Sequence, residues 1–486
     1  MAGIGRALGV ALVGLNGYLV EVEADIGQTL PSFVLLGLPD SALSEARERI
    51  RSAAKNSGLP LSRRKLTVNL IPASLPKRGT GFDLAIAVAS LAAAEDLRPP
   101  AGVVFLAELG LDGQLRPVRG VLPAVMAAVR AGRPDVVVAA ANAQEASLVP
   151  GVRVHAYESL GQLALELGAD PKAVSVPPEH DTGRTEAARQ PVPVPLAAPD
   201  LRDVAGQPEA RTAIEVAAAG GHHIMLVGPP GAGKTMLAER LPGILPDLDD
   251  EAAMEVTAIH SLSGIPGTGS DLIRRPPFES PHHTASAPAI IGGGSGIPRP
   301  GAASRAHRGV LFLDEAPEYE RRVLDSLRQP LESGELVIHR AAGAAAYPAR
   351  FQLVLAANPC PCGQGSGKGL DCTCTAQSKR RYFGRISGPL LDRVDIQLPV
   401  NRLSAVDFGA GTTGEATAVV APRVLEARRR QLDRLGPYGL ETNAQVPGRL
   451  LRGQLRLDPG ATRLLDRAMA NNTLTARGFD RVLRLT

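Results

Sequence analysis

The chain has no tryptophan, and aromatic residues make up only 3% of its 486 residues. Because hydrophobic residues still supply 44% of the sequence, its cores must be built mainly from aliphatic side chains. Cysteine is scarce as well. All four cysteines lie between Cys360 and Cys374, so no disulfide framework can span the chain. The length is sufficient for about three domains.

No apolar run reaches the roughly 20 residues of a membrane-spanning helix, so we expect a cytoplasmic protein without a membrane partner. Arg6 and the apolar stretch 7–15 resemble a signal peptide only loosely. Residues 18–23 continue as a strand pattern, and no cleavage site with a polar spacer precedes them. The net charge of +4 permits a nucleic-acid partner without requiring one.

The most informative stretch is a glycine-rich loop that meets the pattern G-x-x-x-x-G-K-[ST] without exception. It follows an apolar strand pattern over 224–227 and reads Gly228-Pro229-Pro230-Gly231-Ala232-Gly233-Lys234-Thr235. Backbone N–H groups of such a loop, together with the N-terminus of the following helix, bind phosphates. We expect Lys234 to reach the β- and γ-phosphates of ATP and Thr235 to bind Mg²⁺.

A second signature follows 80 residues later, where the apolar run 310–313 ends in Asp314 and Glu315. Ligands of open α/β sheets bind at the carboxyl ends of the strands, which is where these acids would lie. We expect Asp314 to hold Mg²⁺ through water and Glu315 to polarise the attacking water. Asn358, at the end of a strand pattern over 349–356, can contact the γ-phosphate or that water, although Asn at a strand end is commonly a turn former.

The order of patterns divides the chain into an α/β domain (1–175), a proline-rich linker (176–199), an ATPase core (200–402) and a small helical lid (403–486). In the first domain, strands are expected over 19–22, 32–36, 65–71, 103–106, 136–139 and 153–156, and helices over 41–57 and 83–94. In the core, one helix is expected over 321–333, and strands over 335–340 and 349–356 are expected to flank a hairpin turn over 341–348. Helices of the lid are expected over 423–435, 447–454, 459–470 and 476–485.

The four cysteines form two C-x-C pairs separated by a glycine-rich loop, namely Cys360 with Cys362 and Cys372 with Cys374. Four thiolates can surround one tetrahedral zinc ion. Because C-x-C is tighter than the usual C-x₂-C spacing, three interpretations stay open: a structural zinc site, a redox-sensitive pair, or reduced cysteines without a ligand. His282 and His283 also suggest a metal, but no third ligand has a suitable spacing.

Part of the N-terminal domain resembles Lon-type proteases. The run Lys77-Arg78-Gly79-Thr80-Gly81-Phe82-Asp83 is similar to their serine-bearing segment, and residues 110–128 are similar to their lysine-bearing segment. The nucleophile position falls on Gly81 and the lysine position on Leu122. Because a Ser/Lys dyad needs a hydroxyl and an amine, the resemblance implies a Lon-like fold without proteolysis. An unrelated α/β domain is the alternative.

Further motifs extend over nearly the whole chain, namely Gly220-Gly221-His222, Pro281-His282-His283-Thr284, Asn358-Pro359-Cys360-Pro361-Cys362-Gly363 and Gly388-Pro389-Leu390-Leu391-Asp392-Arg393. With the phosphate loop and the acidic strand, they resemble the YifB/ComM-type magnesium-chelatase-like AAA+ ATPases. The resemblance implies a hexameric ring that binds ATP and Mg²⁺ at subunit interfaces. It places Asn358 at the sensor-1 position, Arg393 at the arginine finger acting on a neighbour, and Arg477 at the sensor-2 position of the lid.

The resemblance also implies that the inserts 264–308 and 335–350 point into the ring pore. The family continues beyond the last helix pattern, so we expect a lid truncated at residue 486. The implied function is an ATP-driven motor that acts on single-stranded or branched DNA and promotes branch migration in recombination or natural transformation. Candidate DNA contacts are Arg299, Arg305, Arg308, Arg340, Lys379 and Arg380.

The alternative function is a magnesium-chelatase-like motor subunit that remodels a protein partner. The additional N-terminal domain counts against this alternative. A scaffold that does not hydrolyse ATP is disfavoured because every expected catalytic position carries a suitable residue.

Overall fold

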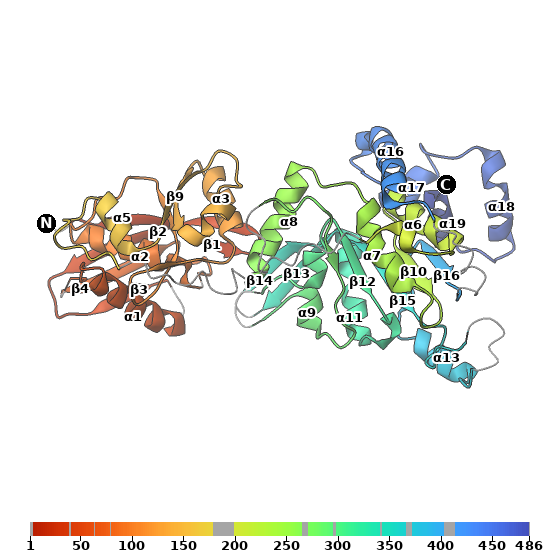
Figure 1. Cartoon of the computed structure of the whole chain (residues 1–486), viewed down its shortest axis with the longest axis horizontal. Helices are drawn as coiled ribbons and strands as arrows, with labels where there is room; N and C mark the ends of the chain where they lie inside the picture. The colour runs from red at the N-terminus through yellow and green to blue at the C-terminus, as the bar shows by residue number, and fades with distance from the viewer. Residues whose placement is uncertain are drawn as a thin grey trace.

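The computed structural model arranges the chain as two α/β bodies in a row, with a group of helices at the C-terminal end (Figure 1). It describes residues 3–37, 40–62, 64–77, 79–177, 199–264, 271–294, 298–340, 343–365, 372–402 and 414–485. The expected linker 176–199 lies outside these ranges except at its two ends. None of the helices described is both long and apolar enough to cross a bilayer.

The N-terminal body is built on a mixed sheet of seven strands, which are β1 (Gly5–Val13), β2 (Asn16–Gly27), β3 (Phe33–Leu36), β4 (Lys65–Ile71), β5 (Val104–Leu106), β8 (Asp135–Ala139) and β9 (Arg153–Tyr157). Their order is β3-β4-β2-β1-β5-β8-β9. β1 and β2 pair antiparallel, from Gly5 opposite Ala24 to Val13 opposite Asn16. A small ribbon of β6 (Glu108–Leu109) and β7 (Leu115–Arg116) lies apart from the sheet.

Helices cover both faces of this sheet. One face carries α1 (Asp40–Asn56), α2 (Asp83–Ala93) and α5 (Leu160–Glu166), and the other carries α3 (Val121–Arg130) and α4 (Ala143–Ala146). Successive residues of a strand point to opposite faces, so Ala7 of β1 packs with α2 while Val10 packs with α3. The sequence predicts no strand over the apolar stretch 7–15, yet most of it forms β1 in the interior of the sheet.

The core contains five parallel strands, β10 (Ile224–Val227), β11 (Phe278–Glu279), β12 (Val310–Leu313), β15 (Gln352–Ala357) and β16 (Ile396–Pro399), in the order β11-β12-β15-β10-β16. This order brings the segments that follow β12, β15 and β10 side by side at one edge. One face is covered by α6 (Pro208–Gly220), α7 (Lys234–Ile244) and α16 (Thr417–Leu435). The other is covered by α9 (Ala287–Ile291), α10 (Ala302–Arg305), α11 (Arg321–Ser326) and α14 (Gly388–Leu391).

Two predictions about the core are wrong. Residues 321–333 form two short helices, α11 and α12 (Arg328–Ser333), which are separated at Leu327. Pro330 has no N–H to donate to the carbonyl oxygen of Ser326, so the helical hydrogen-bond pattern is interrupted there. The hairpin pairs β13 (Glu335–Arg340) with β14 (Gly343–Pro348), not with the strand that follows. That next strand, β15, is buried at all six residues and therefore belongs in the interior of the parallel sheet.

The N-terminal body contacts the core at α8 (Asp250–Ser263) and at β14. Met254 and Ala258 of α8 join the apolar cluster beneath α3. Gly14, at the turn after β1, lies so close to β14 that a Cβ there would be 2.5 Å from the carbonyl oxygen of Ala346. The N-terminal body therefore contacts both α8 and the β13–β14 hairpin of the core.

The C-terminal helices are α17 (Gly448–Leu451), α18 (Pro459–Ala470) and α19 (Ala476–Leu485), which share a small core with the end of α16. Between β15 and β16 lies α13 (Ala376–Phe383), which projects from the core in Figure 1. The 3₁₀ turns are η1 (Thr80–Phe82), η2 (Ala140–Asn142), η3 (Leu201–Asp203), η4 (Ala316–Glu318), η5 (Gly436–Tyr438) and η6 (Asn443–Gln445).

Candidate nucleotide-binding site

The glycine-rich loop joins the end of β10 to the first residue of α7, and its glycines are needed for two reasons. Gly231 and Gly233 have φ of 76° and 89°, a region in which residues with a Cβ are strained. Gly228 has no room, since a Cβ there would lie 2.1 Å from the carbonyl oxygen of Val400. The backbone thus has the curl with which such loops turn their N–H groups toward a phosphate.

Lys234, the first residue of α7, is buried beneath this loop. Its Nζ donates to the carbonyl oxygens of Gly228 (2.7 Å) and Pro229 (3.0 Å) and to Asn358 Oδ1 (3.3 Å). Burial lowers the pKa of the ammonium group, and the carboxylates of Asp314 and Glu315 act in the opposite direction. The ammonium therefore sits inside the loop, where a bound phosphate would replace its carbonyl partners.

Thr235 and Asp314 lie together, as the sequence predicts. The Thr235 hydroxyl donates to Asp314 Oδ2 at 2.8 Å, and Asp314 Oδ1 accepts the backbone N–H of Glu315 at 2.9 Å. A hydroxyl and a carboxylate beside a phosphate loop are the oxygen ligands that Mg²⁺ prefers. The residues present therefore fit Mg²⁺ bound together with nucleotide phosphates.

Glu315 has a partner that the sequence does not predict. The Nδ1 of His283 lies 3.1 Å from Glu315 Oε2. His283 comes shortly after β11, the strand next to β12, so the two side chains meet because their strands are neighbours. Glu315 also has φ of 51°, a left-handed conformation that costs energy in a non-glycine residue and is frequent at functional sites. His283 thus contacts the expected catalytic acid directly.

The two predicted arginines lie away from the loop. Arg393 precedes β16 and Arg477 belongs to the first turn of α19, and both line a hollow of about 960 Å³. His223 and Gly309, which immediately precede β10 and β12, line the same hollow. The hollow therefore lies at the amino ends of the strands. Within one chain, Lys234 therefore lies at the carboxyl ends of the strands, and the two arginines lie at the amino ends.

Cationic groups crowd this hollow. Arg393 is ion-paired with Glu332, and Arg477 with Asp392. Burial lowers the pKa of Arg393, and the nearby guanidinium groups of Arg328 and Arg477 lower it further. Carboxylates line the hollow as well, including Asp249 and Asp395, so an anion would have to displace them as partners of the arginines.

The sulfur atoms of Cys360, Cys362, Cys372 and Cys374, here called the cysteine cluster, all lie within 4.8 Å of one another. Within the described ranges, this is the one group of three or more His, Cys, Asp or Glu side chains that converges in this way. The His282 ring lies tilted against the His283 ring at 4.2 Å between centroids, and its Nδ1 lies 2.8 Å from Thr284 Oγ1.

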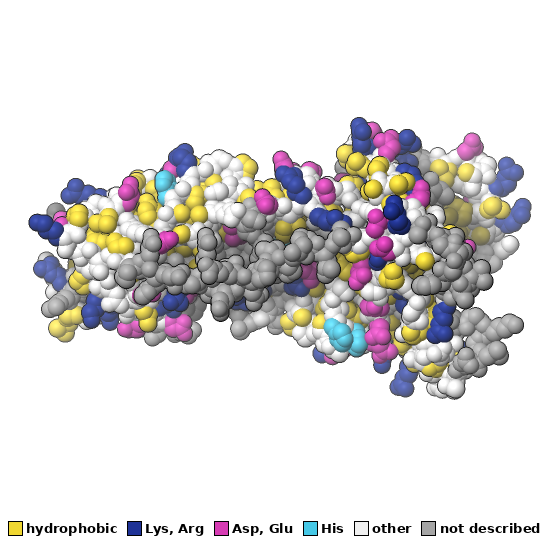
Figure 2. Space-filling model, in the orientation of Figure 1, with side chains coloured by type: hydrophobic (Ala, Val, Ile, Leu, Met, Phe, Trp, Pro, Cys, Tyr) yellow, Lys and Arg dark blue, Asp and Glu magenta, His cyan; other side chains and the backbone are white. Residues whose placement is uncertain are grey.

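Two of the candidate DNA contacts are engaged within the chain. Arg305 donates two hydrogen bonds to Glu279 (3.0 and 2.7 Å), and Arg308 pairs with Glu441 at 3.2 Å. These bonds disfavour both as DNA contacts, whereas Arg380 is exposed on α13. The Arg340 side chain lies outside the description. Over the face shown in Figure 2, cationic and anionic side chains are interspersed.

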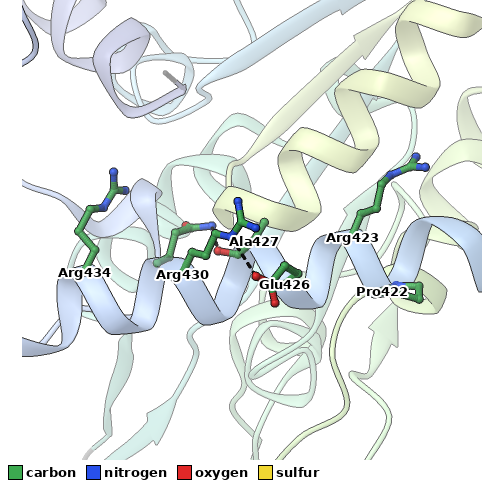
Figure 3. Close-up of a pocket in the computed structure, with 7 residues that line it drawn as sticks. Pro422, Arg423, Glu426, Ala427, Arg430 and Arg434 are labelled. Carbon is green, nitrogen blue, oxygen red and sulfur yellow. Dashed lines mark hydrogen bonds and ion pairs between the residues drawn. The ribbon is translucent and has the colours of Figure 1, made fainter.

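A second hollow, of about 630 Å³, runs along α16 and is drawn in Figure 3. Its lining includes Arg423, Arg430 and Arg434 from one helix. The single carboxylate of the lining, Glu426, accepts a hydrogen bond from Arg430 at 2.9 Å. Without a glycine loop or a free carboxylate, this hollow does not suit a magnesium nucleotide.

Comparison with known proteins accounts for these features. Models described as "Magnesium chelatase, subunit ChlI", "Subunit ChlI of Mg-chelatase" and "Magnesium chelatase, subunit ChlI C-terminal" match residues 200–408, 22–142 and 414–486. An uncharacterized protein of Mycobacterium tuberculosis is 50% identical over 486 residues, which is 99% of this chain and 93% of the relative. Competence protein ComM of Haemophilus influenzae is 40% identical over 479 residues (98% and 91%), and YifB of Escherichia coli is 40% identical over 487 residues (98% and 90%).

This chain is a YifB/ComM-type magnesium-chelatase-like protein. Membership in this family implies an AAA+-type motor with ATPase-type activity that uses ATP and Mg²⁺. Two partial matches are more distant: a magnesium-chelatase 38 kDa subunit of Rhodobacter capsulatus is 28% identical over 150 residues, and a Lon protease of Mycolicibacterium smegmatis is 27% identical over 192 residues. They cover 28% and 38% of the chain and 43% and 24% of the relatives.

The two predicted Lon-like positions differ in their packing. Leu122 is buried in the apolar cluster beneath α3, and Gly81 lies in η1. The neighbouring Thr80 hydroxyl donates to Glu108, and Lys77 Nζ donates to the carbonyl oxygens of Pro72 and Leu75. No amine therefore faces a hydroxyl at these positions.

A K234A variant is expected to bind ATP at least about tenfold more weakly, because a charge-assisted hydrogen bond to phosphate contributes about 1.5–3 kcal/mol. Titration of a fluorescent ATP analogue measures the dissociation constant. E239A, on the exposed side of the same helix, is the matched control and should bind normally. Equal affinity in K234A and E239A would contradict the placement of the phosphates at this loop.

Proposed function

We propose that this protein is a ring-forming ATPase motor in which each nucleotide is bound by one subunit and hydrolysed with the help of the next. One observation carries the proposal. Lys234, Thr235, Asp314, Glu315 and Asn358 meet at the carboxyl edge of the core sheet, whereas Arg393 and Arg477 lie at its amino edge.

Opposite edges of one subunit can meet only in a head-to-tail assembly. Repetition of such a heterologous contact closes into a ring when the rotation allows it, and a hexamer is the arrangement we propose. The γ-phosphate of one subunit would then replace the carboxylate partners of Arg393 and Arg477 in its neighbour. Asn358 would sense that phosphate through its contact with Lys234.

We further propose that the motor moves along single-stranded or branched DNA and promotes branch migration in recombination or natural transformation. The printed name of the Haemophilus influenzae relative, a competence protein, supports this role. Positive charge on α13 supports it as well, since Arg380 and Arg381 are both exposed there. They come shortly before Phe383 in the sequence, and aromatic and basic residues together suit nucleic-acid contact.

A magnesium-chelatase-like subunit that remodels a protein partner is the second candidate, favoured by the family models that match the core and the C-terminal helices. The N-terminal body does not separate the two functions, because a model described as a subunit of Mg-chelatase also matches residues 22–142. Proteolysis is disfavoured because Gly81 has no hydroxyl and Leu122, which has no amine, is buried in an apolar cluster.

DNA should therefore stimulate ATP hydrolysis several-fold at low salt, where phosphate contacts are strongest, and the effect should decline as salt is raised. The measurement is a steady-state ATPase assay with linear, forked and bubble DNAs, combined with strand displacement. An R380A/R381A double variant should lose much of the stimulation, and R130A, an exposed arginine on the N-terminal body, should not. A rate that no DNA changes at low salt would favour a protein substrate.

A further inference from the structure

The cysteine cluster has the dimensions of a metal site. The Cys360 sulfur lies 3.3 Å from that of Cys362 and 3.7 Å from that of Cys372, and the last two are 3.8 Å apart. Four sulfurs placed tetrahedrally at about 2.3 Å from zinc are about 3.8 Å from one another. A disulfide would need a separation of about 2.05 Å, which none of these three pairs approaches.

We infer that the cysteine cluster binds one zinc ion, and that the metal fixes the end of β15 against the phosphate loop. On binding, each of the four thiols loses its proton to solvent. The zinc ion and its four thiolates together then carry a net charge of −2. The Lys379 side chain, on α13, hydrogen-bonds to Cys372 and partly offsets that charge. A site closed by four protein sulfurs has no open position, which is typical of structural zinc.

The first pair of cysteines is packed on the nucleotide site. Cys360 is buried two residues after Asn358. The chain then turns at Gly363, whose N–H donates to the Cys360 carbonyl at 2.9 Å. A Cβ at Gly363 would lie 2.8 Å from the ring of Pro230 in the phosphate loop. The backbone that carries the first two sulfurs therefore lies directly against the loop.

The second pair comes from a different part of the chain, immediately before α13. A metal shared by both pairs links the tip of β15 to the start of α13, and so closes the loop between them. Loss of the metal would leave the turn at Gly363 without this restraint. We expect Pro230 and Asn358 to become more mobile, and nucleotide binding to weaken although no nucleotide contact is removed.

Metal analysis of the purified full-length chain tests the site itself. We expect about one zinc per chain, falling below about half an equivalent in C372S. T373A, a change between two of the proposed ligands, is the matched control and should retain zinc. Zinc below half an equivalent in the wild type, unchanged zinc in C372S, or iron in place of zinc would each overturn the assignment. So would a mass lower by two hydrogen atoms, which indicates a disulfide.

If C372S fails to fold, removal of zinc from the wild type by a chelator should lower the thermal unfolding midpoint, and added zinc should restore it. No change on removal would overturn a structural role. The link to the loop, which rests on the proposed nucleotide site, is tested by hydrogen exchange of residues 228–235 and 358–363. Faster exchange without zinc is expected, and unchanged exchange in a zinc-free folded chain would overturn the link. Zinc content is measured without nucleotide, so it stands or fails independently of ATP hydrolysis.

Discussion

An E315Q variant is expected to bind ATP with nearly normal affinity and to hydrolyse it at least about 100-fold more slowly, the scale on which loss of one preorganised catalytic group acts. Glutamine preserves the size of the side chain but cannot polarise the attacking water as a carboxylate does. The ligands proposed for the nucleotide, Lys234 and Thr235, are untouched by the change. Binding of an ATP analogue and the steady-state rate of phosphate release measure the two quantities separately.

E320Q provides the matched control, because Glu320 lies five residues later, is exposed, and is paired with Arg322. Its rate should equal that of the wild type. Normal turnover by E315Q would show that another group activates the water. Loss of binding and turnover together would instead indicate that the carboxylate is needed to maintain the site, for example through its contact with His283.

An R393A variant is expected to bind ATP and to hydrolyse it about 10³-fold more slowly, the lower end of the effect of an arginine supplied by a neighbour. The physical reason is its position. Arg393 lies at the edge of the sheet opposite Lys234, so it can neutralise a γ-phosphate only across a subunit interface. R322A, whose guanidinium group is exposed on the same domain, is the control and should remain active.

Mixing two inactive variants distinguishes this explanation from a structural one. At an ATP concentration that K234A does not bind, a K234A subunit is empty but still offers Arg393, while an R393A subunit holds ATP and lacks the arginine. In randomly mixed head-to-tail rings, about a quarter of the interfaces would combine the intact halves, so activity should return. If the mixture stays as inactive as its components, Arg393 does not act on a neighbour's nucleotide.

Local patterns predicted the elements of this protein well. The strand over 65–71 and the helices over 459–470 and 476–485 begin and end where the structure places them. These predictions succeed because periodicity and capping act within a few residues. The convergence of Lys234, Thr235, Asp314 and Asn358 was predicted as well, since glycine loops and acids at strand ends have one favourable arrangement in a parallel sheet.

Predictions failed where the partner of a segment had to be known. The pattern over 349–356 was assigned to a hairpin with 335–340. In the structure β15 pairs instead with β12 inside the parallel sheet, and β13 pairs with β14. The stretch 7–15 is similar: an apolar segment near the start of a chain becomes a central strand because β2 and β5 lie on either side of it.

The phosphate loop, the acidic strand and the four clustered cysteines can be recognised without a structure, because each is a motif of residues close along the chain. The contact of His283 with Glu315, the internal ion pairs of Arg305 and Arg308, and the position of Arg393 at the ends of the strands opposite Lys234 depend on how the chain folds. Those relations join residues far apart in sequence, and the order of the strands sets the distances between them.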